Sequence, residues 1–223
     1  MKLVHTEVSG AIITEKKTFT EWIIESPGLF SKYLQEFYVQ CERKEGKFVL
    51  SDNDKELDMS KCVEIIGNPF MVDINSRKIL GKLYSELEEL SRKEQMFEKT
   101  MCLTSTVHEY ILNLEQETNY ILQFDNELEI SALLKALGVR HEEIEDSFFE
   151  RIVRYIKIAA NVLKTKLFVF VNIRSYLLDT QMLELVKEIS YQDIKVLFIE
   201  NQERDCLEGG FRYIIDKDGC EIY

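Results

Sequence analysis

The sequence predicts an α/β fold: a mostly parallel sheet covered by helices on both faces, with a helical region inserted midway along the chain. Three observations lead to this prediction. Leu167–Val171 and Lys195–Ile199 are continuous apolar runs, and each follows a segment with helical periodicity. Between residues 74 and 114 the apolar positions change to a helical spacing, with charges between them. Apolar strands that alternate with helices are typical of a parallel sheet that is buried on both faces.

The amino-terminal third predicts short strands on either side of one helix. Ser26 and Pro27 suit a helix start, because serine can accept a hydrogen bond from a free backbone N–H and proline's fixed φ fits the first turn. We expect this helix to run to about Gly46. The strands expected here are one or two within Lys2–Ile13, then Glu21–Glu25, Lys47–Leu50 and Cys62–Ile66.

The middle of the chain predicts helices. Apolar residues recur at helical spacing over Ile79–Leu90 and Met96–Leu114, which predicts two long amphipathic helices that could pack as an antiparallel pair. Asn119–Phe124 fits a strand or a helix equally well. Leu128–Leu137 predicts a short helix, and Gly138 can adopt the left-handed conformation that often ends one.

The carboxy-terminal third returns to alternating helices and strands. Ser147 and Glu150 have the spacing of a capping box, in which each side chain bonds the backbone of the other residue. The elements expected here are a helix from Ser147 to Lys164, a helix over Asp179–Ser190, the two apolar strands, and an edge hairpin of Arg212–Ile215 and Cys220–Tyr223. The predicted organisation is a discontinuous α/β head domain, residues 1–72 and 138–223, around a helical leg domain, residues 73–137.

Composition indicates a protein with a sizeable core and a reducing environment. Of the 223 residues 45% are hydrophobic, and only two prolines and nine glycines favour long regular elements. The five cysteines are odd in number, widely separated and without a C-x-x-C pair. The start of the chain has no signal-peptide core, and no stretch approaches the roughly 20 apolar residues that a membrane span needs. We therefore expect a cytoplasmic protein with no membrane partner.

The sequence lacks the motifs of common catalytic sites. Ile24–Phe30 occupies the place of a phosphate loop, between a strand and a helix, but has no G-x-x-x-x-G-K-[ST]. Without closely spaced glycines and a following lysine, such a loop cannot wrap a phosphate. His5, His108 and His141 have no serine or cysteine partner in an exposed turn, and no cysteine–histidine cluster suggests zinc. The chain is therefore predicted not to be an enzyme.

Two acidic clusters are candidates for binding a hard cation. The first resembles the start of an EF-hand loop, but Leu57 stands where that loop needs glycine and Val63 where it needs glutamate, so a solvated turn is predicted. The second lies near the junction of leg and head, where converging carboxylates would bind calcium; a solvated face is the alternative. The first cluster is Asp52, Asp54, Glu56 and Asp58, and the second is Glu115, Glu117, Asp125, Glu127 and Glu129.

A basic stripe lies on the helix that the capping box opens. At 3.6 residues per turn its members project within about 140° of arc, opposite an apolar face. The stripe consists of Arg151, Arg154, Lys157, Asn161 and Lys164, preceded by Arg140 and followed by Lys166. Because the formal net charge of −12 repels nucleic acid, binding would require such a local patch. The stripe predicts sequence-independent phosphate contact, and an ordinary solvated helix face is the alternative.

Several segments, in this order and spacing, resemble one known family over most of the chain. The segments are Asp73–Ser76, Ser131–Val139, Phe148–Arg151, Lys166–Asn172, Lys195–Glu200 and Tyr213–Asp216. The family is Csn2 (Csn-two), the CRISPR-associated adaptation protein of type II-A systems, and the chain length resembles its short form. Most matching residues belong to core strands and helices, so their combined order carries the resemblance.

The resemblance implies both a fold and a function. It implies a degenerate P-loop-NTPase-like head with an inserted α-helical leg, and a homotetrameric ring stabilised by structural Ca²⁺. The ring would take the ends of double-stranded DNA into a central basic channel during spacer acquisition. Its partners would be other CRISPR adaptation proteins, the integrase complex and the effector nuclease.

The resemblance also points to residues. Basic residues match the family at Lys135, Arg140, Arg151, Lys164 and Lys166, whereas Arg154 and Lys157 are expected to bind DNA from the stripe alone. Together with the acidic cluster, the resemblance suggests that the calcium ligands are Glu117, Asp125, Glu127 and Glu129.

Two other functions are compatible with the sequence. One is a metal-dependent nuclease that uses Glu117, Asp125, Glu127 and Glu129 to hold paired cations. The other is a protein-interaction scaffold without DNA contact. The leading hypothesis is a non-catalytic DNA-end-binding ring, in which phosphate contacts supply affinity without reading the bases.

Overall fold

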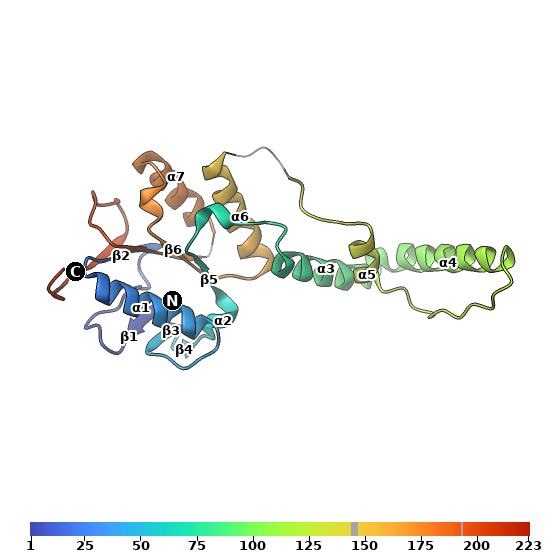
Figure 1. Ribbon diagram of the computed structural model, residues 1–223, viewed down its shortest axis with the longest axis horizontal. Helices are drawn as coiled ribbons and strands as arrows, with labels where there is room; N and C mark the ends of the chain where they lie inside the picture. Colours follow the sequence, from blue (N-terminus) through green and yellow to red (C-terminus); the bar gives the residue numbers. More distant parts are fainter. Residues whose placement is uncertain (144–146, 193) are drawn as a thin grey trace. The chain divides into compact units, whose positions relative to one another are not determined.

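Figure 1 shows the protein as a computed structural model, which describes residues 1–143, 147–192 and 194–223. The chain divides into two compact units, Met1–Ile74 with Ile144–Tyr223 and Asn75–Glu143. We call them the α/β unit and the helical unit. In the ranges described, no helix is both long enough and apolar enough to cross a membrane.

The helical unit extends further than the sequence pattern indicates. The pattern assigns residues 138–143 to the head, whereas the structure keeps them with the helices. Two hydrogen bonds explain the difference. The Tyr84 hydroxyl donates to the Val139 carbonyl (2.7 Å), and the His141 N–H donates to the Asn75 side-chain oxygen (2.9 Å).

Six strands of the described chain form the main sheet of the α/β unit. They are β2 (Phe19–Ile24), β5 (Val63–Ile66), β6 (Leu167–Val171), β7 (Lys195–Glu200), β8 (Phe211–Ile215) and β9 (Glu221–Ile222). Their order is β5-β6-β7-β2-β8-β9, and all neighbours are parallel except β9, which runs antiparallel to β8. Every residue of β6 is buried, as expected for a continuous apolar strand inside such a sheet. The mostly parallel sheet and its edge hairpin are thus confirmed.

Helices cover both faces of this sheet (Figure 1). One face carries α6 (Phe148–Val162) and α7 (Asp179–Ser190), and the other carries α1 (Pro27–Cys41) and a small antiparallel sheet. The small sheet consists of β1 (Lys2–His5), β3 (Phe48–Asp52) and β4 (Lys55–Glu56). Trp22, Phe37 and Phe48 are fully buried in one cluster on this side, and the rings of Phe37 and Phe48 lie 4.9 Å apart. Such burial is a main source of the unit's stability.

Two details of α1 differ from the prediction. The helix ends at Cys41 rather than near Gly46, because Arg43 adopts a left-handed φ of 68°, which a right-handed helix cannot continue. Pro27 opens the helix as expected. The Ser26 side chain, however, makes no capping hydrogen bond within the described chain, so the predicted serine cap is wrong.

The polar run after β3 forms a hairpin turn and a helix cap. Asn53 and Asp54 have φ angles of 47° and 59°, the left-handed pair that suits a tight two-residue hairpin. Asp58 then accepts a hydrogen bond from the Ser60 N–H (3.0 Å) and caps the short helix α2 (Met59–Cys62). The first acidic cluster therefore belongs to local turn structure.

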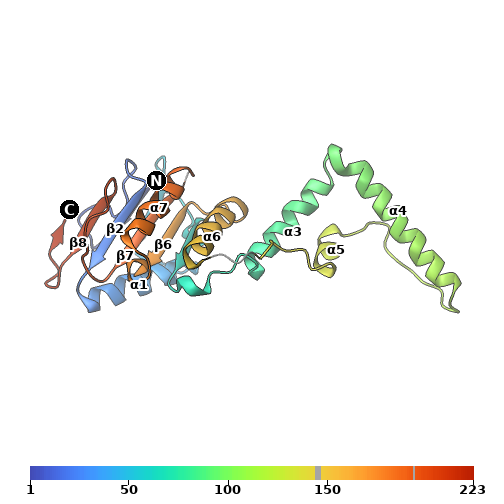
Figure 2. The same cartoon turned by 90° about the horizontal axis from the view of Figure 1, so that it is seen from above.

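Three helices make up the helical unit: α3 (Arg77–Ser91), α4 (Glu94–Gln116) and α5 (Ile130–Ala136). Figure 2 shows α3 and α4 diverging from their connection, so they do not form the expected antiparallel pair, and α3 packs against α5 instead. None of the 23 residues of α4 is buried in the single chain. Asn119–Phe124 is irregular. Gly138 has a φ of 64°, which confirms the predicted left-handed end of the short helix.

The capping box of α6 is confirmed and gives a testable prediction. The Ser147 hydroxyl accepts from the Glu150 N–H (3.3 Å), and the Ser147 N–H donates to the Glu150 carboxylate (2.7 Å). These bonds hold the pKa of Glu150 below its usual range. Ser147→Ala is expected to lower the free energy of unfolding by about 1 kcal/mol, measured by urea unfolding.

Ser26→Ala provides the matched control for this prediction. It removes a serine hydroxyl from the same position of α1, where the side chain makes no capping bond in the described structure. We expect almost no change in stability. Equal losses in the two variants would show that the capping box contributes nothing specific.

Candidate nucleic-acid interface

The structure distributes the predicted DNA-binding residues over both units. Lys135 lies in α5 and Arg140 follows it, both in the helical unit, where Arg140 pairs with Glu143 (3.4 Å). The α/β unit holds the others, namely Arg151, Arg154, Lys157, Lys164 and Lys166. A common surface of these five residues can therefore be described within the α/β unit.

Three lysines of that group line one hollow of about 540 Å³. Lys157 comes from α6, Lys164 from just beyond its carboxyl end, and Lys166 from the residue before β6. The apolar face of α6 orients Lys157, because Ile152, Ile156 and Ala159 are buried and the opposite face must look outward. The hollow is also lined by Asn161, which belongs to the predicted stripe, and by Tyr191 and Gln192 at the end of α7.

The lysines of the hollow are available to an anion. Lys157 pairs with Glu188 (2.5 Å) and Lys166 with Asp52 (3.3 Å), and both lysine side chains remain 48% exposed. Exposed ion pairs contribute only about 0–1 kcal/mol, so a phosphate can displace the carboxylate at little cost. Lys164 is exposed as well.

The amino-terminal half of the stripe lies outside this hollow. Arg151 is exposed, whereas Arg154 is half-buried. Neither residue is among those that line the hollow. The structure therefore brings together only the carboxy-terminal part of the predicted stripe, with Lys166 added.

The predicted calcium ligands do not form a ready site in the single chain. Glu117 follows α4, and Asp125 and Glu127 are exposed on the irregular segment. Glu129 accepts a hydrogen bond from the Ser131 hydroxyl (2.7 Å) beside α5. Among the described residues, no three histidine, cysteine or acidic side chains converge. The residues as arranged do not fit a calcium ion, which needs six to eight oxygen ligands.

The segment at the position of a phosphate loop is a short connection between β2 and α1. Only Glu25 and Ser26 connect β2 to α1, and the Glu25 N–H donates to the Ile215 carbonyl of β8 (2.9 Å). A connection of two residues offers no row of free N–H groups for a phosphate. The local structure agrees with the missing glycine-rich motif.

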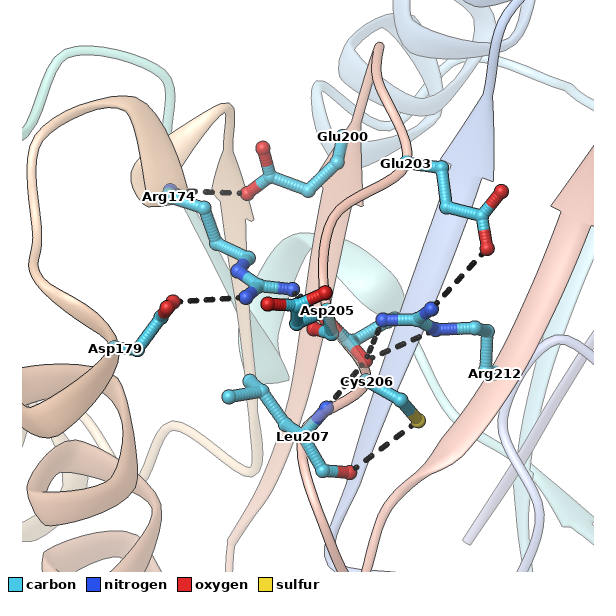
Figure 3. Close-up of polar contacts among 9 residues, drawn as sticks. Arg174, Asp179, Glu200, Glu203, Asp205, Cys206, Leu207 and Arg212 are labelled. Atoms are coloured by element: carbon cyan, nitrogen blue, oxygen red, sulfur yellow. Dashed lines mark hydrogen bonds and ion pairs between the residues drawn. The ribbon is translucent and has the colours of Figure 1, made fainter.

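A network of buried ion pairs lies beside the carboxyl ends of β6 and β7 (Figure 3). Arg174 donates to one carboxylate oxygen of Glu21 (2.7 Å), and Arg212 donates to the other (2.9 Å). The side chains of Arg174 and Glu21 are each only 2% exposed. Arg174 also pairs with Asp179 at the start of α7 (2.9 Å). We call Glu21, Arg174, Arg212 and Glu200 the buried network.

Glu200 is the second acid of the buried network. Its carboxylate accepts from the Arg174 N–H (3.1 Å), and burial raises its pKa to about 7, although Arg174 acts in the opposite direction. The loop after β7 closes over the network: Arg174 donates to the Asp205 carbonyl (2.7 Å), and the Leu207 N–H donates to Glu21 (3.3 Å). Protein groups thus fill the edge where open α/β sheets commonly bind ligands.

Sequence reasoning missed this network, although one signal was present. Glu21 stands inside the apolar strand β2, and a buried acid needs a cationic partner. The partner Arg174 lies 153 residues away. The spacing of apolar residues along the sequence predicts local structure, and it does not show which residues so far apart form an ion pair.

The chain is similar in sequence to one family of known proteins. A sequence profile described as CRISPR-associated protein (Cas_Csn2) matches residues 40–219. The chain belongs to the Csn2 family. The resemblance drawn from the core segments is therefore confirmed, and Csn2 membership gives the chain a CRISPR-associated role.

Two curated Csn2 relatives are similar over most of their length. The CRISPR-associated protein Csn2 of Streptococcus agalactiae is 29% identical over 196 residues, 87% of this chain and 86% of the relative. The CRISPR-associated protein Csn2 of Enterococcus faecalis is 29% identical over 165 residues, 74% of this chain and 72% of the relative.

Solved structures give weaker likenesses. The chain is 13% identical to cbiO1 of Clostridium perfringens, part of the ABC transporter complex cbiONQ, with a TM-score of 0.48 over 95% of this chain and 78% of that one. It is also 13% identical to an ATP-binding cassette of an ABC transporter in the ADP conformation, with a TM-score of 0.48 over 96% and 82%. At these scores neither likeness bears on the function of this Csn2-family chain.

Proposed function

We propose that this Csn2-family chain binds double-stranded DNA, its ends in particular, through phosphate contacts and acts without cleaving it in CRISPR spacer acquisition. One observation carries the proposal. Lys157, Lys164 and Lys166 gather at a single hollow in a chain whose net charge is −12. Lysine contacts to phosphate give affinity that is independent of sequence and sensitive to salt.

A non-catalytic role fits two features better than the nuclease alternative. The ligand-binding edge of the sheet is filled by the buried network. In the part of the chain that is described, the carboxylates a nuclease would use do not converge in threes. Incubation of labelled DNA with magnesium or manganese is expected to leave it intact. Sustained cleavage that disappears in Glu127→Ala would overturn the proposal.

The salt dependence of DNA binding tests the central claim. The variant Lys157→Ala/Lys164→Ala is expected to bind linear duplex about tenfold more weakly near physiological salt. The slope of log K against log salt should become shallower by about 0.9 for each phosphate that the variant no longer neutralises. Fluorescence anisotropy at several salt concentrations measures both quantities. Linear duplex should also bind more tightly than closed circular duplex in matched salt.

Lys217→Ala is the control for the lysine variant. It removes one lysine charge, against two in the variant, from an exposed site in the β8–β9 turn, away from the hollow. We expect little change in affinity or slope. No binding by the wild type even at low salt would favour a scaffold without DNA contact.

Self-association into a ring is the second part of the proposal. α4 exposes many large apolar side chains, and surfaces of this kind commonly mark interaction sites. Phe97, Met101, Leu103, Tyr110, Leu112 and Leu114 are exposed on it. We propose that copies of the chain cover them in a homotetramer with a central DNA channel, as the family resemblance implies.

The solution mass with and without calcium tests this assembly. A tetramer is expected when calcium is present, with a smaller species after chelation. Because the single chain brings no three carboxylates together among its described residues, calcium is proposed only for the assembled form. A monomer under both conditions would contradict the ring.

A further inference from the structure

The lysine-lined hollow contains an aromatic side chain that the proposed phosphate contacts do not use. Tyr191 ends α7, is 86% exposed and forms part of the hollow's wall. No other aromatic ring of the described chain stacks on it. Tyr110 and Tyr120 are also exposed without a ring neighbour in the described chain, but neither lines the hollow, whereas the exposed Tyr223 stacks on Tyr213. The face of the Tyr191 ring is therefore open to a ligand.

The backbone at Lys164 is a second unusual feature of the hollow. Lys164 has a left-handed φ of 56°, directly after the last residues of α6. This position usually holds glycine, because a side chain there is sterically disfavoured. A lysine at such a position places an ammonium group at the hollow at some cost in stability. Strained residues of this kind gather at functional sites.

The charge of the hollow favours an anion. Three lysines line it, of which Lys157 and Lys166 are each paired with a carboxylate, Glu188 and Asp52, that is not itself a lining residue. The carboxyl end of α6 opposes them with only about half an elementary negative charge. Lys164 has no ion pair among the described residues, and its full charge outweighs this dipole. The exposed pairs of Lys157 and Lys166 can exchange their carboxylates for a phosphate at little cost.

We propose that the hollow binds one unpaired nucleotide, with its phosphate on Lys157, Lys164 and Lys166 and its base stacked on Tyr191. The volume of about 540 Å³ is in the range of small-ligand sites. The amides of Asn161 and Gln192 supply donors and acceptors for the base edge. Bases inside a duplex are paired and stack on one another, so only an unpaired nucleotide, free or in an overhang, can lay its base on the ring. The inference rests on the proposed DNA binding, and an unpaired nucleotide at a DNA end is its favoured source.

The test compares blunt duplex with duplex that carries a short single-stranded overhang, both labelled internally and in matched salt. The wild type is expected to bind the overhang form about tenfold more tightly, since stacking on an aromatic ring strengthens binding by that order. Tyr191→Ser should abolish the difference between the two duplexes. Tyr191→Phe, which keeps the ring, should retain it. Lys164→Gly, which suits the left-handed backbone, should weaken both duplexes alike.

A third arm measures binding of free dAMP and separates the two nucleotide sources. If dAMP binds and Tyr191→Ser removes this binding while no DNA binds, the site takes free nucleotides and the proposed DNA binding fails. Equal affinity of the wild type for blunt and overhang DNA, with no dAMP binding, overturns the inference. In that case DNA binding itself still stands if Lys157→Ala/Lys164→Ala weakens it. Absence of binding to every probe overturns both proposals.

Discussion

Replacing Arg174 by methionine is expected to lower the free energy of unfolding by about 3–5 kcal/mol. The change leaves the Glu21 carboxylate, whose side chain is 2% exposed, without its closest cation. It also removes the bonds from Arg174 to Asp179 and to the Asp205 carbonyl. Urea unfolding followed by tryptophan fluorescence measures the loss, because Trp22 is the one tryptophan and is fully buried.

Arg212→Met is the matched control for this variant. Arg212 bonds the same carboxylate, but its side chain is 17% exposed, so water can partly replace it. We expect a smaller loss. Glu21→Gln in the Arg174→Met background should restore part of the stability, because the buried charge is then gone. A loss below about 1 kcal/mol for Arg174→Met would contradict the role of the network.

Glu200 is expected to make the protein less stable as the pH rises from about 4.5 to about 7. Burial raises the pKa of Glu200 to about 7 from its ordinary value of 4.5. Between these pKa values the folded state keeps a proton on Glu200 that the unfolded state has released. The contribution of protonated Glu200 to folding stability is therefore complete below pH 4.5 and is lost as the pH rises through about 7. A difference of about 2.5 pH units corresponds to roughly 3 kcal/mol.

Urea unfolding across this pH range, compared with Glu200→Gln, isolates the effect. The glutamine keeps an acceptor for the Arg174 N–H but cannot titrate. The wild type should therefore lose stability relative to the variant as the pH rises. Glu203→Gln removes an exposed acid that pairs with Arg212 and should leave the slope unchanged. Parallel curves for wild type and Glu200→Gln would show that Glu200 is not the group responsible.

Much of the fold follows from local patterns in the sequence. β6 and α7 have the predicted bounds, because a continuous apolar run and a helical period are visible without tertiary knowledge. The capping box of α6 is equally local, since Ser147 and Glu150 lie within one turn. The end of α1 was not predictable in the same way, because the left-handed φ of Arg43 has no glycine to announce it.

The candidate site was only partly predictable. The spacing of Lys157 and Lys164 on one predicted helix indicated a basic face, but Tyr191 lies at the end of a different helix and joins them only in the folded protein. The buried pair of Glu21 and Arg174 was invisible for the same reason. The family resemblance supplied the CRISPR-associated role, which no single residue pattern indicates.

The strand order has a consequence for how the chain folds as it is synthesised. β2 and β5 belong to the first 74 residues, yet β6 and β7 separate them in the sheet. Their partners are β6, β7 and β8, which all lie beyond residue 166. The helical unit, made of contiguous residues, can form while these early strands have nothing to pair with. Such delayed long-range pairing slows folding and leaves apolar strands exposed to aggregation until the last third of the chain has left the ribosome.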